Sequence, residues 1–261
     1  MIQVQTLKAR MDDPRTMTRF VNVFAARNGV SKEVAAEMYE VEKMHFMVQI
    51  SSIKRCSMVS TLQCFLEVVG NGLSFNQTNK HVYLMPRGER LTYQVTADGM
   101  IYQAKQAGSL ERVTKPVIVY DCDALRREYV DGELKISYSP ADRTGDEKIV
   151  GGFVYLVYKD GTREGVYMDY PMIDRLAKYS AKQNRGKANA LYTANDGQID
   201  EGFFQTKLIK YALKNVRKNG SVGENEVNEE GLLLRDDANP YDSSAANPYE
   251  ETNVDVVNVE I

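Results

Sequence analysis

The chain has 261 residues, of which 43% are hydrophobic and 26% are charged, with a formal net charge of −3. This composition can supply a sizeable core, which excludes a chain that is disordered throughout. The longest apolar run, residues 149–158, is far shorter than the roughly 20 residues that span a bilayer. Residues 1–10 also lack the apolar stretch of a signal peptide. We therefore expect a soluble, cytoplasmic protein without a membrane anchor.

The few cysteines and histidines do not suggest a metal site. Cys56, Cys64 and Cys122 form no CxxC pair, and zinc sites need several such ligands at short spacing. We interpret the three cysteines as buried, reduced thiols. The sequence also lacks a GxxxxGK[ST] loop, which would bind the phosphates of a nucleotide. Asp121 and Asp123 are a weak candidate for the metal ligands of a two-metal nuclease, and we interpret them instead as residues of a turn. We expect no enzyme activity, no metal and no cofactor.

Charge is divided unevenly along the chain. Residues 221–261 contain 11 acidic residues and one basic residue, whereas residues 1–220 contain 32 basic and 25 acidic residues. A basic body with an acidic tail is typical of a protein that binds a polyanion, but a solvated surface with a solubilising tail has the same pattern. We predict that residues 221–261 are disordered because they lack sustained periodicity. Their Asn-Pro-Tyr repeat, at residues 239–241 and 247–249, suits either a docking peptide or a spacer.

Residues 1–75 are predicted to form a helical N-terminal region. Pro14 and Gly29 suit the first turn and the C-terminal cap of one helix. Ser31 caps a second helix, and a third covers residues 57–70. Helical spacing in the second helix also predicts a core stripe. This stripe comprises Val34, Met38, Val41, Met44 and Val48.

From residue 76 the pattern changes to strands and turns, which predicts an α+β core over residues 76–220. Alternating residues predict a hairpin around a basic loop at residues 86–90. Asp-Gly pairs at residues 131–132 and 160–161 predict type I′ hairpin turns. We therefore expect a central antiparallel β-sheet with hairpins, flanked by helices. The predicted strands cover residues 81–85, 91–95, 113–119, 126–130, 134–138, 153–158 and 164–168, and a short helix covers residues 98–107.

Two further predicted helices have basic faces. In residues 171–183, Lys178 and Lys182 lie on a different face from the apolar residues. In the helix predicted over residues 202–218, the cations gather in one stripe opposite the apolar side. Glu is absent from residues 203–218, although a solvated Lys-rich face normally contains Glu for ion pairing. Cations neutralise phosphates and aromatic rings stack on unpaired bases, so the pattern favours single-stranded nucleic acid.

Several short motifs occur in an order that resembles a known family. Residues 69–75 read Val-Gly-Asn-Gly-Leu-Ser-Phe, and residues 80–87 read Lys-His-Val-Tyr-Leu-Met-Pro-Arg. Tyr-Gln at 93–94, Asp-Gly-Met at 98–100 and Ala-Gly-Ser at 107–109 follow. This order resembles the RecT family of phage single-strand annealing recombinases. The likeness covers about residues 50–218, and the chain departs from the family in having no Trp before its last helix.

The resemblance implies a recombinase that binds single-stranded DNA and anneals complementary strands without ATP in the cytoplasm of the bacterial host. It implies a homo-oligomer, as a ring or a helical filament, that holds the annealed duplex in a basic groove. A phage exonuclease or a single-strand-binding protein is the expected partner of the tail. The alternative is a passive single-stranded DNA-binding protein without annealing activity.

We place the groove between the sheet and the two basic helices. The predicted phosphate contacts are Lys80, Arg87, Arg90, Lys105, Arg112, Lys178, Lys182, Arg185, Lys187, Lys207, Lys210 and Lys214. The predicted stacking residues are Tyr83, Tyr93 and Phe203, although each ring also suits a core position. Because Lys207, Lys210 and Lys214 are placed opposite the apolar side of their helix, we expect that replacing them leaves the fold intact.

Overall fold

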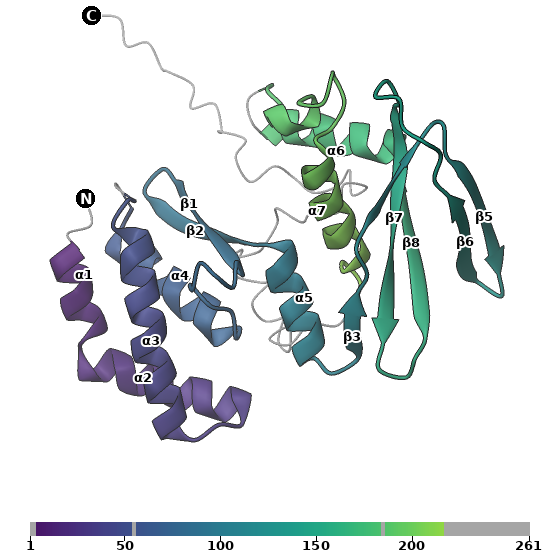
Figure 1. The fold of residues 1–261 in the computed structure, drawn as a ribbon. Helices are drawn as coiled ribbons and strands as arrows, with labels where there is room; N and C mark the ends of the chain where they lie inside the picture. The colour runs from purple at the N-terminus through teal and green to yellow at the C-terminus, as the bar shows by residue number, and fades with distance from the viewer. Residues whose placement is uncertain (1–3, 54–55, 184–185, 217–261) are drawn as a thin grey trace, which may run out of the picture.

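The computed structural model describes residues 4–53, 56–183 and 186–216. Within these ranges, a helical N-terminal part packs against a part that contains strands and helices, and every strand pair is antiparallel (Figure 1). The α+β fold class and the helical N-terminal part are thus confirmed. The predicted acidic tail lies outside the described residues.

Side-chain caps define most of the N-terminal helices. Asp13, Ser31 and Ser57 each accept a hydrogen bond from a backbone amide in the first turn of the helix that follows. Gly29 ends the second helix in the left-handed conformation, with φ 63°. The predicted helices are confirmed, and one additional short helix precedes them. The four helices are α1 (Val4–Met11), α2 (Pro14–Asn28), α3 (Lys32–Ile50) and α4 (Met58–Gly70).

The stripe of α3 that we assigned to the core is instead on the solvent side, so that prediction was wrong. Its five side chains are between 38% and 63% exposed. Tyr39 and Phe46, on the other side of α3, are fully buried, and both rings pack against the ring of Phe65 in α4. Both sides of the helix repeat at helical spacing, and the aromatic cluster determines which one is buried. The buried side comprises Ala35, Tyr39, Glu42, Phe46 and Ile50.

The second part begins with a hairpin and ends with two helices. Its strands are β1 (Val82–Arg87), β2 (Arg90–Val95), β3 (Leu110–Val113), β4 (Val117–Tyr120), β5 (Ala124–Val130), β6 (Glu133–Ser139), β7 (Ile149–Tyr158) and β8 (Arg163–Asp169). Its helices are α5 (Ala97–Gln106), α6 (Tyr170–Gln183), the short 3-10 helix η1 (Ala190–Tyr192) and α7 (Glu201–Ala212).

The strands form three antiparallel sheets rather than one. β1 pairs with β2, and β5 pairs with β6, each as a two-stranded sheet. The largest sheet has β7 at its centre, with β8 on one edge and both β3 and β4 on the other. The single strand predicted over residues 113–119 is therefore two strands, separated by a segment containing Pro116. Proline interrupts the ladder because it has no amide hydrogen.

The two Asp-Gly turns differ in their backbone. At the β5–β6 turn, Asp131 and Gly132 both have positive φ, at 52° and 82°, as a type I′ turn requires. At the β7–β8 turn, Gly161 has positive φ but Asp160 does not. There the Asp160 carboxylate accepts hydrogen bonds from the amide and hydroxyl of Thr162. The hairpins are confirmed, and the type I′ prediction is wrong for the second turn.

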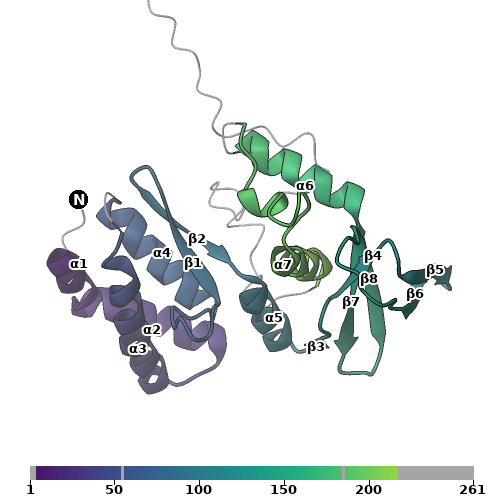
Figure 2. The ribbon, with the colours of Figure 1, turned by 45° about the horizontal axis from the view of Figure 1, so that its top comes forward.

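One hydrophobic cluster joins the two parts of the molecule. It includes Phe46 of α3, Val95 of β2, Met100 of α5 and Leu208 of α7. Figure 2 shows α5 and α7 between the N-terminal helices and the sheet around β7, as does Figure 1. The buried cluster thus extends across the proposed division between residues 1–75 and 76–220, which remains a prediction.

Candidate nucleic-acid interface

The β1–β2 hairpin has one face toward the core and one toward solvent. Cross-strand partners share a face of the sheet, and the register pairs Tyr83 with Gln94, Met85 with Thr92 and Arg87 with Arg90. Tyr83, Arg87 and Arg90 are exposed, with Tyr83 at 60%. We call this side the hairpin outer face. It comprises Tyr83, Met85, Arg87, Arg90, Thr92 and Gln94.

Tyr93 lies on the opposite, inner face of the hairpin. It pairs with Leu84, and both side chains are partly buried against the hydrophobic core. The structure therefore separates the two predicted stacking tyrosines, leaving Tyr83 accessible and Tyr93 on the core side.

Hydrogen bonds hold the hairpin at both ends. At the tip, the Ser57 amide donates to the Glu89 carbonyl at 2.6 Å, and the Leu91 amide donates to the Ser60 hydroxyl at 3.0 Å. At the base, the Thr96 amide donates to the His81 carbonyl at 3.0 Å. The tip is thereby tied to the N-terminus of α4, so the outer face is a fixed surface.

Buried polar contacts support the base of the hairpin. Glu42 of α3 accepts hydrogen bonds from the Ser74 hydroxyl and the Phe75 amide, both at 2.7 Å. The Ser74 amide in turn donates to the His81 ring at 3.2 Å. Burial lowers the pKa of His81, while the carboxylates of Glu42 and Asp98 act in the opposite direction. A lowered pKa favours the neutral ring, and a neutral His81 can accept the hydrogen bond from the Ser74 amide at Nδ1.

Close packing also explains part of the sequence motif at residues 98–100. A Cβ added to Gly99 would lie 2.3 Å from the His81 carbonyl oxygen, so no larger residue fits there without movement. Sequence reasoning did not identify Glu42, because it assigned the other side of α3 to the core; in the structure Glu42 lies on the buried side with Tyr39 and Phe46.

The cations of α6 are exposed. Lys178 and Lys182, which we predicted as phosphate contacts, are both exposed on this helix, and so is Arg175. Lys187, just after α6, is exposed as well, whereas Arg185 lies outside the described residues. Lys80, Lys105 and Arg112 are also exposed; Lys80 lies two residues before β1, Lys105 in α5 and Arg112 in β3.

The cations of α7 do not form an open stripe, contrary to our expectation. The helix ends at Ala212 instead of continuing to residue 218, and residues 203–214 are all half-buried or buried. Lys210 donates to the Val95 carbonyl at 2.6 Å, which ties α7 to β2. Lys214 lies beyond the helix. Lys207, Lys210 and Lys214 are thus half-buried rather than part of a solvent-exposed basic face, and their role as phosphate contacts stays a prediction.

Phe203 is part of a local ring cluster. Its ring meets that of Tyr192 edge-on, with centroids 5.1 Å apart. The Lys207 ammonium lies 5.0 Å from the centroid of the Phe203 ring and 6.0 Å from that of Tyr192. Phe203 and Lys207, both predicted site residues, therefore contact other side chains of the protein. Phe203 is less accessible to a base than the exposed Tyr83.

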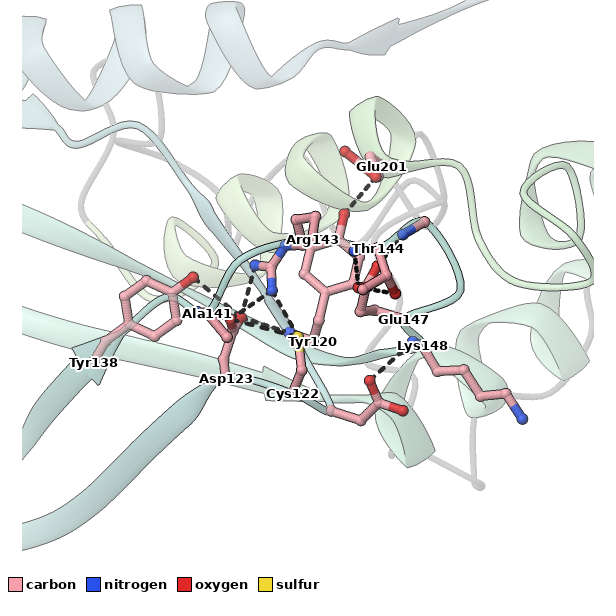
Figure 3. A network of polar contacts seen from close by, with 12 residues as sticks. Tyr120, Cys122, Asp123, Tyr138, Ala141, Arg143, Thr144, Glu147, Lys148 and Glu201 are labelled. Atoms are coloured by element: carbon pink, nitrogen blue, oxygen red, sulfur yellow. Dashed lines mark hydrogen bonds and ion pairs between the residues drawn. The ribbon is translucent and has the colours of Figure 1, made fainter.

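A second polar network lies at the β4–β5 turn (Figure 3). The Asp123 side chain is 0% exposed and accepts two hydrogen bonds from Arg143, at 2.6 and 2.9 Å. The amides of Tyr120 and Ala141 and the hydroxyl of Tyr138 also donate to Asp123. The hydrogen bonds from Arg143 are the main cause of the lowered pKa of Asp123. The sequence predicted the turn at Asp121 and Asp123, but it did not predict that Arg143 pairs with Asp123.

Asp121 and Cys122 lie in the same turn as Asp123. Asp121 accepts a hydrogen bond from the Lys148 amide at 3.1 Å. Cys122 is exposed, contrary to our expectation, and its sulfur accepts a hydrogen bond from Arg143, whereas Cys56 and Cys64 are buried. In the part of the chain that the structure describes, no group of three or more His, Cys, Asp or Glu side chains could hold a metal ion.

The class of protein follows from these surfaces. Exposed cations and an exposed ring on a fixed hairpin, together with a helix that exposes further cations, are typical of a nucleic-acid-binding protein with an α+β fold. A scan against protein families matches residues 35–243 to the RecT family. The chain belongs to the RecT family, which implies single-strand DNA annealing in recombination. A search among curated proteins finds no match. No helix among the described residues is long and apolar enough to cross a membrane.

Proposed function

We propose that this protein binds single-stranded DNA on the hairpin outer face and anneals complementary strands without ATP during phage recombination. Family membership supports annealing, and the sequence has no GxxxxGK[ST] loop to hold a nucleotide triphosphate. The observation that carries the proposal is the outer face itself, where Tyr83 and two arginines are exposed on a hairpin fixed at both ends.

The chemistry of this face suits a strand that must remain available for pairing. The guanidinium groups of Arg87 and Arg90 can neutralise phosphates, and Tyr83 can stack on a base without using its Watson–Crick edge. A second strand is then retained when base pairing adds enough stability. Because binding and pairing the strands break no covalent bond, this mechanism needs no ATP hydrolysis.

We propose that the strand continues from the hairpin toward α6. Both views show the hairpin and α6 on the upper side of the molecule, with α7 below α6 (Figures 1 and 2). Lys178 and Lys182 would contact phosphates at the α6 end. Lys80, Lys105, Arg112 and Lys187 are additional proposed contacts. The homo-oligomer, the cytoplasmic location and the tail's exonuclease or single-strand-binding partner also belong to this proposal.

A passive single-stranded DNA-binding protein is the alternative function. It would use the same cations and rings, so binding measurements alone do not separate the two. The difference is kinetic, because a passive binder covers the strands without accelerating their pairing.

The test is to mix two complementary labelled oligonucleotides with the protein in the absence of ATP and to follow duplex formation and strand length together. We expect duplex formation well above the protein-free rate, with both strands intact. Binding without acceleration would identify a passive binder. A requirement for ATP, or shortening of the strands, would contradict the proposal.

A further inference from the structure

A further exposed ring lies on α5, at the base of the β1–β2 hairpin. Tyr102 is 37% exposed, and its ring packs against the ring of His81, with centroids 4.4 Å apart and planes inclined by 31°. His81 itself is 7% exposed. β2 leads directly into α5 at this end of the hairpin (Figures 1 and 2). An accessible ring that rests on a buried ring can stack with another ring on its open side.

The row of side chains on the hairpin outer face extends toward Tyr102. The Thr96 amide donates to the His81 carbonyl, so the ladder between β1 and β2 continues one residue beyond Val82. Alternate residues of a strand share a side, and His81 therefore lies on the side that carries Tyr83. Two residues of a strand span about 7 Å. Since the His81 ring also contacts the Tyr102 ring, one short single strand can reach both tyrosines.

Hydrogen bonds through Thr96 fix α5 against the base of the hairpin. Thr96 is the N-cap of α5, and its hydroxyl accepts from the Gly99 amide at 3.0 Å. The same hydroxyl donates to the carbonyls of Lys80 and His81. Tyr102 is thus held on a helix that is tied to β1. A ring with a fixed position costs less conformational entropy when it binds a base.

The charges near Tyr102 suit a polyanion. Lys105 is exposed and follows Tyr102 by three residues, which places it on the same side of α5. Lys80, directly before His81, is exposed as well. Asp98 is an exposed acidic residue on this side, but it lies in the first turn of α5, where the helix dipole favours an anion. Cations beside an accessible ring are typical of a surface for single-stranded nucleic acid.

We propose that Tyr102 is a second stacking site for single-stranded DNA, supported from behind by the buried ring of His81. This inference rests on the proposed function, because it extends the bound strand from the hairpin outer face onto α5. One base of the strand would stack on Tyr83 and another on Tyr102. The alternative role of Tyr102 is to cover His81, which needs an apolar side chain but no aromatic ring.

Substitutions at Tyr102 separate stacking from covering. The measurement is fluorescence titration of a labelled oligothymidine, with circular dichroism as the check on the fold. Tyr102→Phe keeps the ring and should bind within about twofold of the wild type. Tyr102→Leu keeps an apolar cover over His81 without a ring, and it should bind at least about fivefold more weakly. The control is Tyr129→Leu, since Tyr129 is a 77% exposed tyrosine on β5. Wild-type affinity of Tyr102→Leu, or equal losses in Tyr102→Leu and Tyr102→Phe, would overturn the proposal.

The second test uses the wild-type chain, so it does not depend on the folding of a variant. An oligothymidine that carries one 5-iodouracil is irradiated in the complex, and mass spectrometry identifies the crosslinked residues. We expect crosslinks to Tyr83 and to Tyr102. A crosslink to Tyr83 without one to Tyr102 would overturn this inference and leave the proposed hairpin surface in place. Crosslinks to neither tyrosine would overturn the proposed surface and this inference together.

Discussion

Lys210 donates a 2.6 Å hydrogen bond to the Val95 carbonyl and so connects α7 to β2. Replacing it with Ala leaves this half-buried carbonyl without that partner. We expect Lys210→Ala to lower the free energy of unfolding by about 1 kcal/mol, measured by urea denaturation.

A suitable control is Lys178→Ala, which removes an exposed lysine from α6 and should change stability by less than about 0.5 kcal/mol. Equal stability of the Lys210 and Lys178 variants would show that the contact with Val95 contributes nothing measurable. If Lys210→Ala also binds DNA more weakly, its loss of stability has to be measured first. Only a loss of affinity beyond that effect would indicate a lost phosphate contact.

The Asp123–Arg143 pair predicts a pH dependence of stability. The pKa of Asp123 is lowered in the folded protein, mainly by Arg143. Such a carboxylate stabilises the fold above its unfolded pKa of about 3.9, and this contribution is lost as the pH falls through the folded pKa. We expect Asp123→Asn to lower the free energy of unfolding at neutral pH by about 2 kcal/mol. Its difference from the wild type should shrink below about pH 4.

Urea denaturation of both proteins at several pH values measures this difference. Asp146→Asn serves as the control, since Asp146 is an exposed carboxylate on the segment between β6 and β7 that carries Arg143. A difference between Asp123→Asn and the wild type that grows toward low pH would have the wrong sign for a lowered pKa.

At the scale of elements, the hairpin outer face predicts a change in salt dependence. Arg87 and Arg90 lie opposite each other beside the turn. Each phosphate contact on a single strand contributes about 0.7 to the slope of log K against log salt. Replacing both arginines with Ala should make the slope shallower by about 1.4.

Fluorescence titration of a labelled oligonucleotide at four or more salt concentrations gives this slope. Circular dichroism should show an unchanged fold, because both side chains are exposed. The double variant Lys135→Ala Arg126→Ala, on the distant β5–β6 hairpin, is the matched control. An unchanged slope in the Arg87 and Arg90 variant would move the binding surface away from the hairpin.

Local structure was predictable from the sequence where a single short segment determines the backbone conformation. Ser31 caps its helix as predicted, and Asp131-Gly132 forms its expected turn. The buried side of α3 was not predictable from spacing, because apolar residues repeat on both of its sides. Contacts with aromatic rings of other helices determine which side is buried.

The candidate site was predictable only in part, for a similar reason. Arg87, Arg90 and Tyr83 are exposed as expected, since a basic hairpin loop is normally solvated. Lys210 is instead engaged with Val95, 115 residues away in the sequence. A helical wheel shows which residues share a side of a helix, and it cannot show which distant element packs there.

At the scale of the whole molecule, the hairpin depends on elements from both parts. The N-terminus of α4 holds its tip through Ser57 and Ser60, and α7 reaches its base through Lys210. Glu42 of α3 supports the segment that leads into β1. The proposed DNA surface is therefore fixed by residues from the helical N-terminal part and the end of the α+β part together.

The most direct test of this account is the annealing rate, without ATP, of Tyr83→Ala compared with Tyr129→Ala. Both tyrosines are exposed on hairpin strands, at 60% and 77%, but Tyr83 alone lies on the hairpin outer face. Loss of one stacking ring should weaken binding by about 1–3 kcal/mol. At protein concentrations below saturation, we expect Tyr83→Ala to anneal at least about tenfold more slowly, while Tyr129→Ala keeps the wild-type rate. Equal rates for the two variants, or a wild type no faster than the protein-free reaction, would contradict the account.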